Sequence, residues 1–157
     1  MPEPFIPKMG ARIMSLQHPE NKMSKSETDT GGCICLLDSP DDIRRSFKRA
    51  VTDSEMSVRC DPSKPGVSNL MQIYAVCTGK TMDEIEREFD GRGYGEFKEA
   101  VGEAVVTLLT PIREEAQRLI ADKAYLESVY RAGADKASQV ADKTLRKVYK
   151  KVGFVAR

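Results

Sequence analysis

Apolar residues recur at helical spacing along much of the chain after residue 38, and the positions between them are polar. The clearest stripe runs from Val101 to Ile112, as on one buried face of a helix that begins near Glu96. Pro111 falls within this stripe. Because proline has no amide hydrogen and its ring crowds the preceding turn, we expect a kink or a break there.

End signals mark the other expected helices. Ser39 precedes a proline and two aspartates, which is typical of the first turn of a helix. Thr81 and Glu84 have the spacing of a capping box, and glycines stand where helices are expected to stop. The expected helices are Pro40 to about Val51, one capped by Ser68 or Asn69 and ended by Gly79, Thr81 to about Phe89, the long helix from Glu96, Tyr125 to Arg131 ended by Gly133, and Ala137 to Val152 stopped by Gly153.

The first 38 residues lack this periodicity. Three prolines open the chain, Arg12–Leu16 alternates like a short strand, and Gln17–Gly32 is polar, as in a long loop. Cys33–Asp38 is a second short apolar run, typical of a strand or of the lead-in to a helix. We therefore predict a mainly α protein, in which a short strand and a loop within residues 1–38 precede a helical domain formed by residues 39–157.

Composition and charge fit a folded globular domain. Hydrophobic residues make up 40% of the chain and charged residues 31%, and the formal net charge is only +1. The charge is unevenly distributed: residues 81–103 hold eight acids and three bases, whereas residues 133–157 hold seven bases and two acids. The basic stretch is either a solvated helix face or a surface that lies near phosphate.

The cysteines and the single histidine do not form a metal-binding pattern. Cys33 and Cys35 are two residues apart, no CxxC pair occurs, and His18 is far in sequence from Cys60 and Cys77. We therefore expect reduced thiols and no metal site. The sequence shows no apolar run of membrane-spanning length and no signal peptide, so we expect a protein of the cytosol or of an organelle matrix, with the cytoplasm as the predicted location.

The polar loop contains the pentapeptide Lys22-Met23-Ser24-Lys25-Ser26, or KMSKS. It places two ammonium groups three residues apart, with hydroxyls and backbone N–H groups between them. No neighbouring residue is placed by the sequence to activate a serine as a nucleophile. The loop therefore suits the binding of phosphate and the stabilisation of its charge. The alternative is a solvated basic loop, since two lysines at this spacing are common.

The whole pentapeptide is more specific than its two lysines. KMSKS is the second signature of the class I aminoacyl-tRNA synthetases, and its context resembles the tryptophanyl branch of that family rather than the tyrosyl branch. The segments that carry this resemblance are PKMGARIMSL, AVTDSE, KPGVSNL and GRGYGEFKEAV, and it extends from about Pro4 to Gly153. The resemblance implies that the full protein activates tryptophan with ATP as tryptophanyl-adenylate and transfers it to tRNA(Trp).

The resemblance also implies roles for residues of the loop. Lys22 and Lys25 match the motif lysines that hold the β- and γ-phosphates of ATP and stabilise charge in the transition state. Hydroxyls of the motif bind by hydrogen bonds, and apolar side chains pack near the adenosine. The implied nucleotide-binding set is Ile13, Lys22, Met23, Ser24, Lys25 and Ser26. For Ile13 a plain core position is the alternative, and Mg²⁺ would bind with ATP mainly through phosphate oxygens.

The same resemblance implies a missing N-terminal catalytic half. Class I synthetases carry a first signature, a HIGH-like motif in a Rossmann-like fold, and His18 with the Pro-Glu-Asn that follows does not match it. Residues 1–38 would be the C-terminal end of that catalytic domain, whose main part is absent, and residues 39–157 the anticodon-side domain. We expect the isolated chain to be inactive and the full enzyme to be a homodimer. The candidate tRNA contacts are Arg44, Arg45, Lys48, Arg49, Lys143, Arg146, Lys147 and Lys150.

Two other functions fit the helices alone. The chain could be a non-catalytic helical RNA-binding module, or a helical scaffold that binds a protein partner. A scaffold has no physical need for KMSKS on a glycine-bounded loop, so the pentapeptide favours the synthetase fragment.

Overall fold

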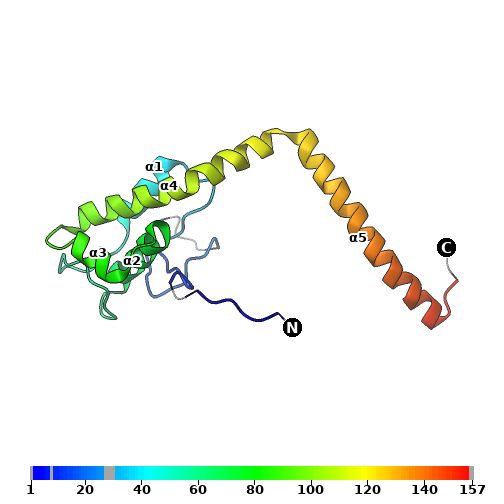
Figure 1. Cartoon of the computed structure of the whole chain (residues 1–157), viewed down its shortest axis with the longest axis horizontal. Helices are drawn as coiled ribbons and strands as arrows, with labels where there is room; N and C mark the ends of the chain where they lie inside the picture. The colour runs from blue at the N-terminus through cyan, green and yellow to red at the C-terminus, as the bar shows by residue number, and fades with distance from the viewer. Residues whose placement is uncertain (1, 8, 27–30, 156–157) are drawn as a thin grey trace. The chain divides into compact units, whose positions relative to one another are not determined.

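The structure is a computed structural model that describes residues 2–7, 9–26 and 31–155. Within these ranges it contains five helices and one isolated antiparallel bridge (Figure 1). The predicted mainly α fold is therefore confirmed. The helices are α1 (Pro40–Arg49), α2 (Pro65–Thr78), α3 (Met82–Glu88), α4 (Tyr94–Ala121) and α5 (Lys123–Val152).

The chain divides into two compact units, Met1–Arg113 and Glu114–Arg157. The first unit contains the pentapeptide, α1 to α3 and most of α4. The second contains the end of α4 and all of α5. The boundary predicted between residues 38 and 39 falls inside the first unit and stays a prediction about function.

Two of the predicted helix starts carry the expected caps. The hydroxyl of Ser39 accepts a hydrogen bond from the backbone N–H of Asp42 at 3.2 Å, and Pro40 opens α1. Thr81 and Glu84 form a complete capping box at the start of α3. The backbone N–H and hydroxyl of Thr81 donate to the Glu84 carboxylate and hold its pKa below the usual range.

The predicted start of α2 is wrong, because the helix begins three residues before Ser68, at Pro65. Proline suits a first helical position, since its fixed φ matches the helix and its missing N–H is not needed there. The Ser68 hydroxyl is used elsewhere: it donates to the carbonyl of Asp61 at 3.0 Å and accepts from its N–H at 3.1 Å. Asn69 points into the core and bonds to the loop region described below.

The break at Pro111, one of the two alternatives predicted there, and the predicted helix end at Gly133 are also wrong, whereas a kink at Pro111 stays a prediction. α4 continues through Pro111 and ends at Ala121, and α5 continues through Gly133. Pro111 and Thr107, the residue one turn before it, are both exposed, so water can solvate the carbonyl that proline leaves without a partner. One glycine costs a helix only about 0.5–1 kcal/mol, too little to end α5. The break lies at Asp122, whose carboxylate accepts from the N–H of Tyr125 at 3.0 Å.

The predicted strand at Arg12–Leu16 is reduced to the single bridge between Met14 and Lys22. The apolar run Cys33–Asp38 forms neither strand nor helix; its backbone turns, and the N–H of Cys35 donates to the carboxylate of Asp38 at 2.7 Å. A strand requires a neighbour along its length, and the described residues supply one for a single position. The predicted loop Gln17–Gly32 also includes residues 27–30, which lie outside the described residues.

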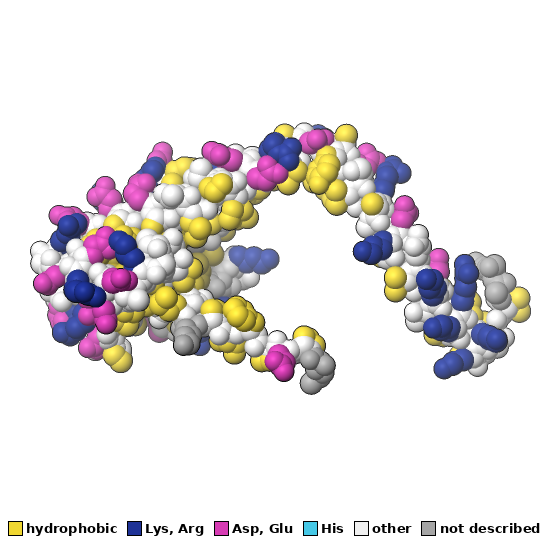
Figure 2. All heavy atoms as spheres, in the orientation of Figure 1, with side chains coloured by type: hydrophobic (Ala, Val, Ile, Leu, Met, Phe, Trp, Pro, Cys, Tyr) yellow, Lys and Arg dark blue, Asp and Glu magenta, His cyan; other side chains and the backbone are white. Residues whose placement is uncertain are grey.

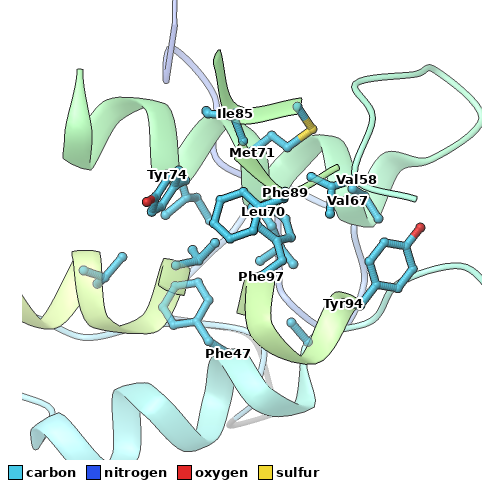
Figure 3. Packing of buried hydrophobic residues seen from close by; sticks show 14 of the residues in the cluster. Phe47, Val58, Val67, Leu70, Met71, Tyr74, Ile85, Phe89, Tyr94 and Phe97 are labelled. Carbon is cyan, nitrogen blue, oxygen red and sulfur yellow. The ribbon is translucent and has the colours of Figure 1, made fainter. Parts of the chain in front are cut away.

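The core of the first unit is built from aromatic and aliphatic side chains of all four of its helices. Figure 3 shows Tyr74, Phe89 and Phe97 pointing toward one another, with Leu70 among them and Phe47 of α1 beside them. The rings of Phe89 and Phe97 have centroids 4.9 Å apart, and Tyr74 is edge-on to both, at 5.6 and 6.3 Å. Such pairs add to the stabilisation by burial and fix α2, α3 and α4 relative to one another.

Gly66 allows α2 to pass close to the backbone of Val51. A β-carbon at Gly66 would lie 2.2 Å from the Val51 carbonyl oxygen. Because backbone must shift to relieve this contact, we expect Gly66→Ala to lower the free energy of unfolding by about 1–3 kcal/mol. Gly95→Ala in α4 is the matched control, since its added β-carbon meets no atom within 4 Å. Urea unfolding followed by circular dichroism gives both values, and equal midpoints would contradict the prediction.

The second unit has no buried side chain on α5. Apolar residues of α5 are largely exposed, among them Tyr130, Val140 and Val152. Basic side chains gather toward the C-terminal end of the helix (Figure 2). In the part of the chain that the structure describes, no helix is long and apolar enough to cross a membrane.

Candidate functional site: the KMSKS loop and its base

Backbone hydrogen bonds pair the segment before the pentapeptide with the start of the pentapeptide itself. The N–H of Ser15 donates to the carbonyl of Asn21 at 2.8 Å, and the N–H of Met23 donates to the carbonyl of Ile13 at 3.0 Å. Between them the chain reverses in a turn, in which the N–H of Asn21 donates to the backbone carbonyl of His18 at 2.8 Å. The first two residues of the pentapeptide are therefore held against residues 13–15 by this short antiparallel pairing.

The loop is closed and tied to α1 through Leu16, which is buried. The N–H of Leu16 donates to the carbonyl of Gly32 at 2.9 Å, so the two ends of the loop meet. The carbonyl of Leu16 accepts from the N–H of Val51 at 2.8 Å, and the side-chain amide of Gln17 donates to the carbonyl of Arg49 at 3.1 Å. These bonds join the loop base to the end of α1.

The predicted site residues divide into buried anchors and exposed polar groups. Ile13 and Met23 are half-buried and pack against the hydrophobic core, whereas Lys22 and Lys25 are exposed. Ser24 and Ser26 are exposed too, and the N–H of Ser26 donates to the Ser24 hydroxyl at 3.3 Å. The structure thus brings all six predicted residues to one loop and its base.

Neither motif lysine forms an ion pair with any residue of the described ranges. Their ammonium groups extend from a loop that is held at its base, so they are available to an external anion. His18, the one histidine, lies 3.6 Å from the carboxylate of Glu20 on the surface. Within the described ranges no three potential metal-ligating side chains come together. The chemistry that this loop offers is the binding of phosphate by mobile cations and backbone N–H groups.

Asn69, predicted from the sequence as a possible helix cap, has a different role in the structure. Asn69 lies within α2 and only 2% of its surface is exposed. Its side-chain amide bonds to both backbone groups of Met14. An asparagine inside a helix is unfavourable unless its side chain has a partner, so its position was a signal that could have been used.

Three of the segments that carry the resemblance, AVTDSE, KPGVSNL and GRGYGEFKEAV, meet at one buried lysine, a contact that the sequence did not reveal. Lys64 is 2% exposed, and its ammonium group lies 2.6 Å from the Glu55 carboxylate and 3.2 Å from that of Asp53. The hydroxyl of Tyr94 donates to Asp53 at 2.7 Å. Hydrogen bonding to Glu55 is the main cause that raises the pKa of Lys64 above its usual value. Lys64 therefore stays charged and fastens the 53–57 segment to α2 and α4.

The basic residues of α1 are not equally available to a nucleic acid. Arg44 is bound by the carboxylates of Glu103 and Asp41, and the hydrogen bond to Glu103 raises its pKa. Arg45 pairs with Asp42 at 3.0 Å. Lys48 and Arg49 are exposed and make no ion pair with the described residues. On α5, Lys143, Arg146, Lys147 and Lys150 are also without an ion pair among those residues.

The site thus consists of two exposed lysines on a loop whose base is held by backbone hydrogen bonds. Residues 1–110 match the model of the family tRNA synthetases class I (W and Y). The chain therefore belongs to this family, as its motifs predict.

Within the family the chain is most similar to proteins of the tryptophan branch. It is 50% identical over 155 residues to the tryptophan–tRNA ligase of Clostridium tetani and 49% identical to that of Wolinella succinogenes. Each alignment covers 99% of this chain and 46% or 47% of the relative. The crystal structure of tryptophanyl-tRNA synthetase from Mycoplasma pneumoniae, 28% identical, superimposes with a TM-score of 0.73 over 95% of this chain and 45% of that one. The chain thus spans about half the length of the relatives it matches.

Proposed function

We propose that this chain supplies the KMSKS loop and the helical tRNA-side domain of a tryptophan–tRNA ligase. The full protein would condense tryptophan and ATP to tryptophanyl-adenylate and pyrophosphate, and then transfer the acyl group to tRNA(Trp). The observation that carries the proposal is the pair of exposed lysines, Lys22 and Lys25, on a loop whose base is braced by backbone hydrogen bonds. Identity near 50% to tryptophan–tRNA ligases supports the choice of amino acid.

In this proposal the loop acts by electrostatics and positioning. Lys22 and Lys25 follow the β- and γ-phosphates as negative charge grows on the leaving pyrophosphate. Ser24 and Ser26 add hydroxyl donors, and the half-buried Ile13 and Met23 offer an apolar surface to the adenosine. The motif contains lysines and serines but no carboxylate that could bind Mg²⁺ directly. These residues therefore fit an ion that is bound mainly through the phosphate oxygens of ATP. When bound with ATP, the ion would neutralise part of the phosphate charge.

The division of labour along the chain is part of the same proposal. Residues 1–38 would complete a nucleotide-binding domain that an N-terminal catalytic half supplies, and residues 39–157 would face tRNA(Trp). Lys48, Arg49 and the unpaired basic residues of α5 are the favoured contacts to phosphate, since Arg44 and Arg45 are already paired. We propose a cytoplasmic, homodimeric full enzyme.

The proposal is tested by tryptophan-dependent ATP–pyrophosphate exchange. We expect no exchange above background from the purified chain, because phosphate-binding lysines have no transition state to stabilise without a bound tryptophan and ATP. Adding an N-terminal half that carries the HIGH-like motif, as a second polypeptide or fused ahead of Met1, should restore exchange. Exchange by the chain alone would contradict the predicted dependence. Absence of exchange from a mixture in which the two halves bind each other would overturn the proposal.

A non-catalytic RNA-binding module is the second candidate, favoured by the exposed basic residues at the end of α5. That function would give RNA binding that weakens steeply with salt, because phosphate contacts release counterions. An RNA-binding module would also leave ATP–pyrophosphate exchange absent when the chain is mixed with an N-terminal half. The same two assays therefore separate the candidates.

A further inference from the structure

The two backbone groups of Met14 point away from the pentapeptide. In an antiparallel pair, residues opposite each other either exchange both hydrogen bonds or exchange none. Met14 and Lys22 are of the second kind, because the bonds that flank their bridge join Ser15 to Asn21 and Met23 to Ile13. The N–H and carbonyl of Met14 therefore need a partner on the side away from Lys22.

Asn69 of α2 bonds to both of these groups. The N–H of Met14 donates to Oδ1 of Asn69 at 2.9 Å, and Nδ2 of Asn69 donates to the carbonyl of Met14 at 2.9 Å. One side-chain amide thus takes the place of a neighbouring strand, 55 residues away along the chain. With 2% of Asn69 exposed, water is poorly placed to replace either bond.

We infer that Asn69 is a positioning residue that, through Met14, sets the place from which the two KMSKS lysines reach the phosphates. This inference rests on the proposed function of the loop. Asn69 is not expected to touch the nucleotide. Its effect comes from the backbone: Met14 is paired with Lys22, so a displaced Met14 displaces the origin of the lysine side chains. Displacements of about 1 Å are enough to slow an enzyme step on the order of a hundredfold.

The chemistry of the amide explains why asparagine is needed. Aspartate has nearly the same shape but, when ionised, accepts hydrogen bonds only, so it loses the bond to the Met14 carbonyl. Leucine has a similar size and offers neither donor nor acceptor. The variants Asn69→Asp and Asn69→Leu therefore remove one and both bonds. Gln72 on the same helix makes no hydrogen bond with the described residues, so Gln72→Glu and Gln72→Leu are matched controls.

The first measurement is amide hydrogen exchange on the full 157-residue chain. We expect Asn69→Leu to raise the exchange rates of Met14 and Met23 by about tenfold or more, since each 1.4 kcal/mol of lost protection corresponds to a factor of ten. Asn69→Asp should give a smaller rise. The exchange rate of the Phe97 amide should be unchanged in the Asn69 variants. In both Gln72 variants the exchange rates of Met14 and Met23 should be unchanged. Unchanged exchange at Met14 in Asn69→Leu would overturn the inference.

The second measurement is single-turnover formation of tryptophanyl-adenylate by the chain combined with the N-terminal half. We expect both Asn69 variants to slow this step by about 10- to 100-fold with the KM for tryptophan unchanged. A fall in rate together with a raised tryptophan KM would show general damage and overturn the inference. Faster hydrogen exchange at Met14 with an unchanged rate of adenylate formation would overturn the inference too. The proposed function would then remain intact, because the unsubstituted chain combined with the N-terminal half still makes adenylate. If the unsubstituted pair makes none, the proposed function fails, and the inference fails with it.

Discussion

Replacing Lys25 by alanine is expected to slow adenylate formation by about 100- to 1,000-fold in the assembled enzyme, the usual effect of losing one donor to developing transition-state charge. Lys25 is exposed and forms no ion pair with the described part of the chain, so its ammonium group is not committed to a structural role. It lies three residues after Lys22, whose backbone is bridged to Met14. The affinity for tryptophan should change little, because the lysine acts on the phosphates.

The measurement is a single-turnover reaction in which adenylate is quantified after rapid mixing with ATP and tryptophan. Lys136→Ala, which removes one exposed positive charge from α5, is the control and should react at the rate of the unsubstituted protein. The comparison separates a specific contact from a change in net charge. An unchanged rate in Lys25→Ala would remove this lysine from the mechanism.

Short-range signals in the sequence predicted two of the helix starts correctly, those of α1 and α3. The Ser39 cap, and the Thr81–Glu84 capping box, each depend on residues three apart, and the structure confirms both. The left-handed glycines that end α2 and α5, Gly79 and Gly153, were predicted for the same reason. Each of these signals is complete within one turn of the chain.

The helix breaks that were predicted from single residues, at Pro111 and Gly133, did not occur. Pro111 and Gly133 are unfavourable in helices, but each lies at an exposed position of a long helix, and the remaining residues keep the helix continuous. The strand at Arg12–Leu16 failed for a different reason. Its partner in the described residues is one short segment of the loop, and sequence alternation carries no information about what lies alongside.

The residues of the candidate site could be predicted from the sequence, but the contacts that hold them in place could not. The pentapeptide and Ile13 could be identified from the order of residues, since they lie within 14 positions of one another. The clamp by Asn69 joins positions 55 apart, and the Lys64 cluster joins three separate flanking segments. Contacts of this kind arise only when the chain is folded, and a single sequence taken alone carries no covariation that would reveal them. The residues of the candidate loop could therefore be predicted from the sequence, whereas the residues that brace it are visible only in the structure.

Phe97→Ala is expected to cause the largest loss of stability, about 3–5 kcal/mol in the free energy of unfolding of the first unit. Phe97 is fully buried and stacks edge-on with Phe89 and Tyr74. Truncation would remove the buried ring and both aromatic contacts, and would leave a cavity where α2, α3 and α4 meet. Domains are usually stable by only about 5–15 kcal/mol, so this loss is a large fraction of the total.

Urea unfolding followed by far-ultraviolet circular dichroism measures this change, with Phe5→Ala as the control. Phe5 is 92% exposed, so the same substitution there should alter the free energy of unfolding by less than about 0.5 kcal/mol. The midpoint for Phe97→Ala should fall while the slope with urea stays the same, because the surface exposed on unfolding is nearly unchanged. A loss below about 1 kcal/mol would mean that neighbouring side chains fill the space, contrary to close packing of this core. α2 also carries Asn69, which bonds to the backbone of Met14. If Phe97→Ala loosens the packing of α2, it should therefore also weaken the base of the loop, although the pentapeptide itself is unchanged.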